Sequence, residues 1–271
     1  MSRPVLALLT DFGLRDHYVG SMKAAALSVC PDLTLVDITH DIAPHDILDG
    51  ALQLAASFKY FPAGTVFVAV VDPGVGSTRR GIAAEAGEYR FVAPDNGLLT
   101  AVLQETPAKR IVELTERRYF RPTVSRTFEG RDRFAPAAAW LLRGVELNAL
   151  GRPVHDPVLL DLPRPEVRDD ELYGRIVQED RFGNLITNID RRTFDKFTAR
   201  RVVYTRAASQ AVVHRLSPLH YSAATATGES GVPVKFSAGV YALRSSAAER
   251  LSCHWLPTNG GAATAPSASR D

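Results

Sequence analysis

Short, unbroken runs of apolar residues, rich in β-branched side chains, recur through the first 150 residues of the chain. They do not alternate with polar positions, which is typical of strands buried on both faces of a sheet. We expect six such strands, at residues 5–10, 33–39, 66–71, 81–84, 89–93 and 111–114.

Segments with the helical period lie between several of these strands. They cover residues 18–29, 46–58, 98–103 and 134–143. Strand–helix–strand order predicts a layered α/β domain with mostly parallel strands over residues 1–160. Pro31, Pro44 and Pro62 fall between the expected elements, where a missing N–H group costs nothing.

The pattern changes after residue 160. Residues 161–171 are polar, contain proline and have no periodicity, which predicts a linker. Turn residues then separate short strand-like runs at 172–179, 185–189, 201–205, 210–214, 232–236 and 239–243, and we expect no helix among them. They predict a small antiparallel sheet or β-barrel domain over 172–256. The tail at 257–271, rich in Gly, Ala, Ser and Thr, is expected to be disordered.

Composition excludes several classes of protein. The 271 residues include 45% hydrophobic residues, and 32 Lys and Arg balance 30 Asp and Glu, so the chain is not disordered throughout. A net charge of +2 gives no strong attraction to nucleic acid. The apolar runs are shorter than the ~20 residues of a membrane span. Two cysteines and the lack of a signal peptide in the first residues predict a cytoplasmic protein, not a disulfide-stapled secreted module.

Acidic residues follow three of the expected N-terminal strands. Asp11, Asp72 and Asp95 each lie in a turn that also contains glycine. Because the carboxyl ends of parallel strands share one edge of the sheet, where ligands bind, we expect these acids to lie close together. Asp is also common after strands because it forms turns and helix caps, so a structural role for each one is an equal alternative.

A cluster of carboxylates suits a cation, either a hard metal such as Mg²⁺ or an organic cation, and it also suits a ribose diol. The glycines at 74–76 lack the Lys of a phosphate loop. His40 and His45 have a spacing that suggests a metal site, but Pro44 interrupts any helix that would bring them together. We expect Asp46 to cap the following helix instead.

Two further turns carry candidate functional residues. The turn that ends in Asp132 precedes a helix, so Asp132 either serves a site or caps that helix, with Pro136 in its first turn. The second turn combines the aromatic ring of Phe182 with the amide of Asn184, a pair that can stack on a purine and bind its edge. An ordinary hairpin turn is the alternative for this segment.

Five motifs occur in one order between residues 5 and 190. They are LTDFG with a following Asp at 9–16, VDPGVG with a following Arg at 71–79, APDNGL at 93–98, F-x-GRD at 128–132 and FGN-x-x-TN at 182–188. Together they resemble the S-adenosyl-L-methionine (SAM) hydroxide adenosyltransferases, which are SAM hydrolases related to the fluorinases and chlorinases. The resemblance implies an α/β domain, a β-barrel domain and a homotrimer whose sites lie between neighbouring subunits. The implied reaction converts SAM and water to adenosine and L-methionine without a metal or other cofactor.

The resemblance also implies roles for individual residues. Asp72 and Arg79 match two members of the family's Asp–Arg–His triad, which surrounds the nucleophilic water, and Glu129 stands at the position of the His. Asp11 matches the acid that binds the ribose hydroxyls, and Asp16 lies in the same turn.

Residues of the second domain match contacts that a neighbouring subunit supplies to the adenine and methionine parts of SAM. They are Phe182 and Asn184, with Asp180 beside them. Residues 221–243 lack the Asn-Ser-x-Gly segment that holds the methionine carboxylate in relatives.

Three alternatives to the hydrolase stay open, and the first of them arises from Glu129. A carboxylate accepts a hydrogen bond from water but cannot supply a positive imidazolium, and a second acid near Asp72 needs an offset, for which Arg79 or Arg131 is expected. One alternative is therefore a protein that binds SAM or adenosine without turnover. The second is a halogenase, which is less favoured because the halogenases carry Tyr where this chain has Asp72. The third is a Mg²⁺-dependent hydrolase that uses Asp11, Asp72 and Asp95.

Overall fold

The computed structural model describes residues 3–168, 171–181 and 185–196, together with the backbone of five later strands between residues 202 and 255. The chain divides into two compact units, residues 1–162 and 163–271. In the described residues, no helix is both long enough and apolar enough to cross a membrane.

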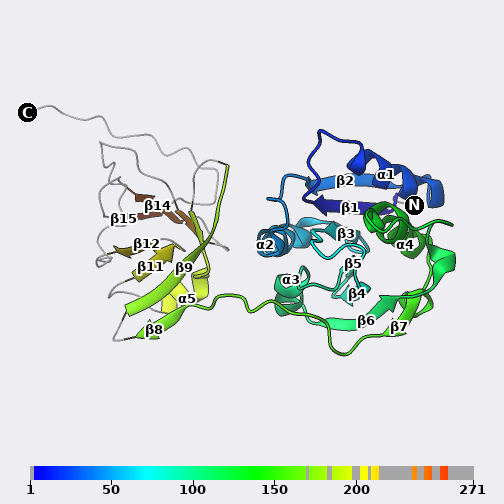
Figure 1. Ribbon diagram of the computed structural model, residues 1–271. Helices are drawn as coiled ribbons and strands as arrows, with labels where there is room; N and C mark the ends of the chain where they lie inside the picture. Colours follow the sequence, from blue (N-terminus) through cyan, green and yellow to red (C-terminus); the bar gives the residue numbers. More distant parts are fainter. Residues whose placement is uncertain are drawn as a thin grey trace, which may run out of the picture. The chain divides into compact units, whose positions relative to one another are not determined.

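The first unit is built on a seven-stranded sheet with the strand order β2-β1-β3-β5-β4-β6-β7 (Figure 1). Neighbouring strands are parallel from β2 to β5, and β4, β6 and β7 join with antiparallel pairing. The strands are β1 (Val5–Thr10), β2 (Thr34–Thr39), β3 (Val66–Val70), β4 (Gly81–Ala86), β5 (Tyr89–Pro94), β6 (Ala108–Leu114) and β7 (Gly151–Pro153). The expected α/β unit with parallel central strands is confirmed.

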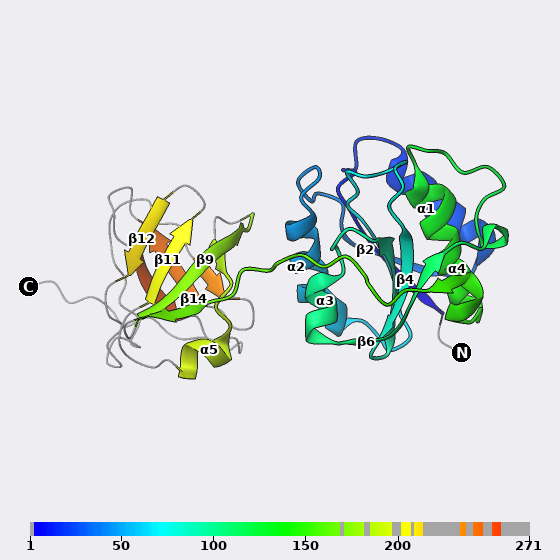
Figure 2. The ribbon, with the colours of Figure 1, turned by 60° about the horizontal axis from the view of Figure 1, so that its bottom comes forward.

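Helices cover both faces of this sheet (Figure 2). On β1, Leu6 and Leu8 face the core shared with α1 (Tyr18–Val29) and α4 (Ala135–Leu142). Ala7 and Leu9 face the opposite core, which includes residues of α2 (Ile47–Ser57) and α3 (Thr100–Glu105). Burial on both faces explains why the strands are apolar at successive positions. Short helical turns complete the unit: η1 (Phe58–Tyr60), η2 (Arg117–Tyr119), η3 (Gly130–Phe134) and η4 (Leu147–Leu150).

Asp46 begins α2 as the sequence predicts. Its side chain accepts a hydrogen bond of 2.9 Å from the backbone N–H of Asp49, which satisfies one of the free donors in the first turn.

The second unit contains a six-stranded sheet and a two-stranded hairpin. The strands are β8 (Glu166–Arg168), β9 (Glu171–Glu179), β10 (Leu185–Thr187), β11 (Val202–Arg206), β12 (Ser209–Val213) and β13 (Val234–Phe236), with β14 (Tyr241–Ser245) and β15 (Leu251–Trp255) in the hairpin. β9 pairs with β11 in parallel, as β10 does with β13, and the other pairs are antiparallel. The sheet is therefore mixed rather than purely antiparallel, and its closure into a barrel stays a prediction.

Two elements of the second unit differ from the sequence prediction. A short helix, α5 (Arg191–Lys196), forms where no helix is expected, because the Asp190 side chain accepts a 2.7 Å hydrogen bond from the N–H of Thr193 and caps its first turn. β8 lies inside the segment predicted as a linker. Its three residues are held by antiparallel pairing with β9, which a search for apolar periodicity does not detect.

Candidate active site at the strand ends

Strand direction brings acids and arginines to one edge of the first sheet. β1, β3 and β5 are parallel, so Asp11, Asp72 and Asp95 follow them at the same edge. β4 is antiparallel to β5 and begins where β5 ends, since Gly81 pairs with Pro94. Arg79 and Arg80 directly precede β4 and therefore lie among the acids.

Asp72 and Arg79 form a buried ion pair in the turn between β3 and β4. Arg79 Nε donates to both carboxylate oxygens of Asp72, at 3.0 and 2.9 Å, and its Nη2 also donates to Oδ2. The Asp72 and Arg79 side chains are 4% and 11% exposed. The Arg79 guanidinium also lies 5.2 Å from the centre of the Phe134 ring. Charge-assisted, two-pronged pairing of this kind fixes the orientation of the carboxylate.

Glu129 joins this pair from a distant part of the sequence. Its Oε2 lies 2.7 Å from Arg79 Nη2, so Arg79 bridges the Asp72 and Glu129 carboxylates. Arg133 approaches the same Glu129 oxygen from the other side, with its Nη1 at 3.4 Å. The three residues predicted to form the catalytic triad are therefore in contact.

Arg133, and not Arg131, is the second arginine that offsets Glu129. Arg131 donates instead to Asp132, from Nε and Nη2 at 2.7 Å each, and its guanidinium lies over the ring of Phe128. The prediction for Arg131 was wrong because residues four apart on a helical turn share a face, whereas residues two apart do not. The spacing from Glu129 to Arg133 was the signal that could have identified Arg133.

Burial and charge act differently on the two arginines of the cluster. Burial lowers the pKa of Arg79, but the hydrogen bond and charge of Asp72 outweigh it, with help from Glu129, and the pKa is raised. Burial also lowers the pKa of Arg133, and the Glu129 carboxylate offsets this only in part. Arg79 is thus the more firmly charged of the two.

Glu129 precedes η3, a π-helical turn that continues into α4 through a hydrogen bond from Ala135 N to Gly130 O. Such wide turns are frequent at functional sites. Asp132 lies inside this turn, fully buried, and accepts a 2.9 Å hydrogen bond from Ser125 N. Of the two roles considered for Asp132, that of a helix cap was wrong, because α4 continues directly from the π turn and has no free N-terminus there.

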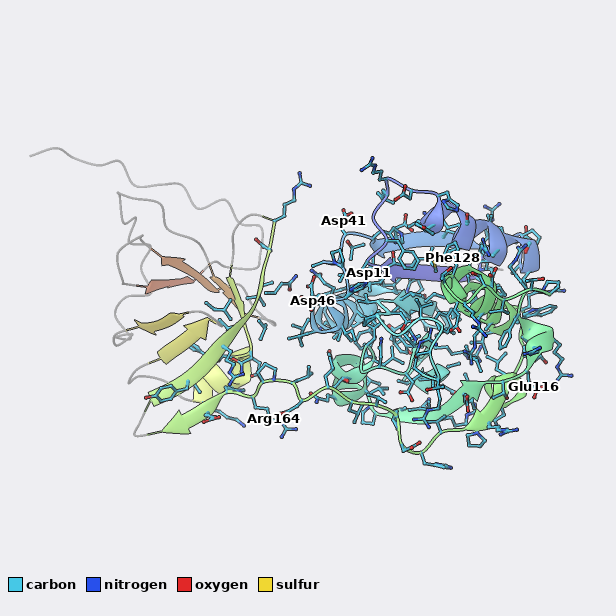
Figure 3. All side chains as sticks on the ribbon, viewed as in Figure 1. Asp11, Asp41, Asp46, Glu116, Phe128 and Arg164 are labelled. Carbon is cyan, nitrogen blue, oxygen red and sulfur yellow. The ribbon has the colours of Figure 1, made fainter. Side chains whose placement is uncertain are left out.

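Asp11 and Asp16 lie on the loop after β1. Asp11 is half-buried, and its Oδ2 accepts a 2.9 Å hydrogen bond from His45 N, which ties this loop to the loop after β2. Figure 3 shows Asp11 with Asp41 and Asp46 at this end of the unit. Asp16 is exposed.

The predicted substrate contacts of the second unit are only partly described. Asp180 directly follows β9 and is half-buried. Phe182 and Asn184 lie outside the described residues, as does most of the segment 221–243.

Asp95 does not belong with the other two acids. Its buried carboxylate accepts hydrogen bonds of 2.8 Å from Arg80 Nε and from Val158 N, while Arg80 also pairs with Asp156. These bonds hold the segment after β7 against the sheet edge. Asp95 is therefore committed to the fold, which removes it from the set Asp11, Asp72 and Asp95 considered for Mg²⁺.

His40 and His45 do not form a metal pair. The buried His40 ring has Nδ1 at 2.8 Å from the Thr10 hydroxyl and Nε2 at 3.1 Å from Asp37 Oδ1. His45 contributes its backbone N–H to Asp11. In the part of the chain that the structure describes, no group of three or more His, Cys, Asp or Glu residues is arranged to hold a metal ion.

An aromatic cluster beside the triad was not predicted. The Phe128 ring centre lies 5.0 Å from that of Tyr18 and 6.0 Å from that of Phe12, both in edge-to-face geometry. These rings connect the start of α1 to the residue that precedes Glu129. Their separation in sequence left no local signal.

Comparisons with known proteins identify the family of this chain. The family domain described as "SAM hydroxide adenosyltransferase N-terminal domain" matches residues 6–151, which is more than half of the chain. An (R)-S-adenosyl-L-methionine hydrolase of Salinispora tropica is 41% identical over 185 residues, which cover 67% of this chain and 70% of that protein. A fluorinase of Nocardia brasiliensis is 32% identical over 275 residues, 91% of each chain.

A solved structure extends the similarity over both units. The crystal structure of an uncharacterized conserved protein from Thermotoga maritima matches with a TM-score of 0.74 and 31% identity, covering 92% of this chain and 91% of that one. The sequence and structural matches together show that this chain belongs to the SAM hydroxide adenosyltransferase family.

Proposed function

We propose that this protein hydrolyses SAM to adenosine and L-methionine, with water attacking the C5′ carbon of the ribose. The observation that carries the proposal is the contact of Asp72, Arg79 and Glu129 at the strand-end edge. The (R)-S-adenosyl-L-methionine hydrolases of Salinispora tropica and Methanocaldococcus jannaschii, 41% and 40% identical to this chain, support it.

The reaction needs an oriented water and an acceptor for its proton. A bond forms between the water oxygen and C5′, the bond from C5′ to sulfur breaks, and its electron pair stays on the sulfur. Sulfur leaves as a neutral thioether, so no metal is needed to stabilise the leaving group. One proton is released for each SAM consumed. Catalysis is then chiefly positioning of the water in line with the sulfur, assisted by proton transfer to a carboxylate.

The charges of the cluster suit a neutral nucleophile. Asp72 and Glu129 present carboxylates on both sides of Arg79, and each can accept a hydrogen bond from water. Because Arg79 and Arg133 pair with these carboxylates, the cluster has no net positive charge that would hold a halide ion. This electrostatic argument favours hydrolysis over halogenation in this chain.

The other proposed contacts with the substrate rest on the resemblance to the family. Asp11 would bind the ribose hydroxyls and Asp16 would lie beside the substrate. Asp180, Phe182 and Asn184 would come from the second unit of a neighbouring copy in a homotrimer. A cytoplasmic location is part of the same proposal.

Incubation of the full chain with SAM, followed by chromatography and mass spectrometry, tests the reaction. We expect adenosine and methionine in equal amounts, undiminished by EDTA. Both sulfonium epimers are assayed, since the relatives are named for the (R) form. Parallel incubations with fluoride or chloride detect 5′-halo-5′-deoxyadenosine, which would contradict hydrolysis as the reaction.

A matched pair of variants assigns the activity to the cluster. Asp72→Asn keeps the shape of the side chain but removes its charge, and we expect turnover to fall by about 10²-fold or more. Asp32→Asn changes an exposed acid just before β2, at the opposite edge, and should leave turnover unchanged. Tight SAM binding without any adenosine in the wild-type chain would instead support the non-catalytic alternative.

A further inference from the structure

A pocket of 510 Å³ lies beside the Asp72–Arg79–Glu129 cluster, in the first unit. It is formed by the end of β6, the segment 115–124 and η3, and neither Asp11, Asp72 nor Arg79 lines it. Glu129 and Arg133 form the wall that the pocket shares with the cluster. In Figure 3, Glu116, a neighbour of the lining residues, lies far from Asp11.

The lining of this pocket is strongly basic. Arg117, Arg121 and Arg133 contribute three positive charges against the single carboxylate of Glu129. A concave surface with an excess of one charge concentrates ions of the opposite sign. The pocket therefore favours an anion.

The arginines have hydrogen-bond donors to spare. Arg133 donates from Nη2 to Leu114 O and from Nη1 to Glu129, but its buried Nε has no acceptor among the described residues. The guanidinium of Arg117 is exposed and makes no hydrogen bond or ion pair with the described part of the chain. Arg121 approaches Asp132 at 3.3 Å from one nitrogen, Nε, which leaves its other donors available. A buried N–H without an acceptor is costly, so it points to a ligand or water that accepts from it.

The other walls indicate what the anion is attached to. Thr115 and Thr123 add hydroxyls that have no hydrogen-bond partner in the described part of the chain, and Phe120 and Val124 add apolar surface. A guanidinium fork matches a phosphate group with two parallel hydrogen bonds. The volume lies in the range of small-molecule sites and is larger than a lone phosphate requires.

We propose that this pocket binds a small phosphorylated molecule, with its phosphate held by Arg117, Arg121 and Arg133. Binding of the phosphate would also affect Glu129, because Arg133 Nη1 lies 3.4 Å from the Glu129 carboxylate. This is the longest contact in the series of ion pairs that connects Asp72, Arg79, Glu129 and Arg133. A phosphate that draws Arg133 toward itself weakens its hold on Glu129. The effect on turnover rests on the proposed function, whereas the binding does not.

Calorimetric titration of the full chain tests the binding, with inorganic phosphate and pyrophosphate as probes and sodium chloride of equal ionic strength as the reference. We expect saturable binding, tighter for pyrophosphate, that Arg117→Gln weakens at least tenfold. Arg118→Gln is the matched control. It removes an equal charge one residue away, from a guanidinium that lies 4.9 Å from the Tyr119 ring centre and does not line the pocket.

The outcomes distinguish specific phosphate binding in the pocket from non-specific electrostatic attraction to the arginines. Absence of saturable binding overturns the proposal, as does equal weakening by Arg117→Gln and Arg118→Gln. Thr123→Val provides a second, uncharged change, and it should weaken phosphate binding without altering the response to ionic strength. If the chain binds phosphate but releases no adenosine from SAM, the pocket stands and the proposed hydrolase activity fails.

Discussion

At the scale of single residues, the charge at position 129 determines what the neighbouring arginines do. Glu129 is negative, whereas a histidine there is neutral or positive. The Glu129 carboxylate contacts both Arg79 and Arg133, and Arg79 also pairs with Asp72. These two acids and two arginines together form a neutral cluster. Burial of four charges is tolerable only when each one is paired.

This pairing predicts the effect of restoring the histidine. From the sequence alone, Glu129→His is expected to raise turnover, but the contacts now indicate the opposite, because Arg79 and Arg133 would face each other without the acid between them. We expect roughly tenfold slower turnover for Glu129→His and recovery in the double variant with Arg133→Met, which corresponds to a coupling of about 1–2 kcal/mol. Steady-state kinetics of the four proteins measure it, and additive effects would contradict the pairing.

The sequence predicted three of the four charged residues of this cluster but missed Arg133. Asp72, Arg79 and Glu129 belong to motifs that occur in a fixed order. Asp95 and Arg131 also belong to motifs and were candidates for the site. Instead, Asp95 accepts hydrogen bonds from Arg80 and Val158 N, and Arg131 donates to Asp132. Which partner a charged side chain selects depends on tertiary packing, and short motifs do not carry that information.

At the scale of elements, two segments must meet to assemble the site, the turn between β3 and β4 and the loop before η3. Gly76 lies at their contact, with a φ of +76°. A Cβ atom there would clash with the carbonyl oxygen of Arg126. The turn that holds Arg79 is therefore fixed against the loop that leads to Glu129.

Gly76→Ala is expected to disturb both stability and activity. The positive φ costs about 1–2 kcal/mol for alanine, and displacement of the loop adds to it, so we expect a loss of about 3 kcal/mol and at least tenfold slower turnover. Gly64→Ala is the control, since it has a φ of +82° and open space around its Cβ position. It should lose only the backbone cost, with normal turnover. Thermal unfolding and SAM kinetics of both variants make the comparison, and equal turnover would contradict a positioning role.

Asp132, in the π turn, makes the stability of the fold depend on pH. Burial raises the pKa of Asp132, but the hydrogen bonds of Arg131 and Ser125 N and the charge of Arg121 outweigh it, so that its pKa is lowered. A carboxyl group with a lowered pKa in the folded state stabilises the fold above its unfolded pKa of about 4, and this stabilisation disappears as the pH falls through the folded value.

We expect Asp132→Asn to lower stability by about 2 kcal/mol at pH 7, because it removes charged hydrogen bonds at a buried position. The difference from the wild type should stay constant down to about pH 5 and shrink below about pH 4. Unfolding midpoints from pH 3 to 8 measure it, with Asp41→Asn, a change at an exposed acid, as the control. A difference that does not depend on pH would show that Asp132 acts through packing alone.

Most helices and strands of the first unit were predictable because they bury an apolar face, whereas β7, η3 and α5 were not, and none of the three residues of β7 is buried. The π turn depends on packing around Asp132 and Gly130, where a Cβ would approach Met22 Sδ to 3.1 Å. α5 has only six residues, and its capping Asp190 was its local signal.

At the scale of the whole molecule, the two units differ in how far their topology follows from local pattern. Strand–helix–strand order implies parallel pairing in the first unit. In the second unit, β9 pairs in parallel with β11 and β10 with β13, although the turn-rich sequence suggests antiparallel hairpins. Pairing between strands that are distant in sequence is set by the assembled sheet, so the pattern within each strand does not reveal it.

The proposed assembly makes a quantitative prediction for mixed oligomers. If Asp72 of one copy and Phe182 with Asn184 of a neighbour complete each site, an inactive Asp72→Asn chain and an inactive Phe182→Ala/Asn184→Ala chain should complement each other. In every cyclic trimer that contains both chains, one of the three sites joins an intact first unit to an intact second unit of the neighbour. We therefore expect about a third of wild-type turnover from co-expressed, doubly tagged oligomers, with a mass of about three times the 29.5 kDa chain. Each variant expressed alone is the control. No recovery in mixed trimers would mean that each chain completes its own site.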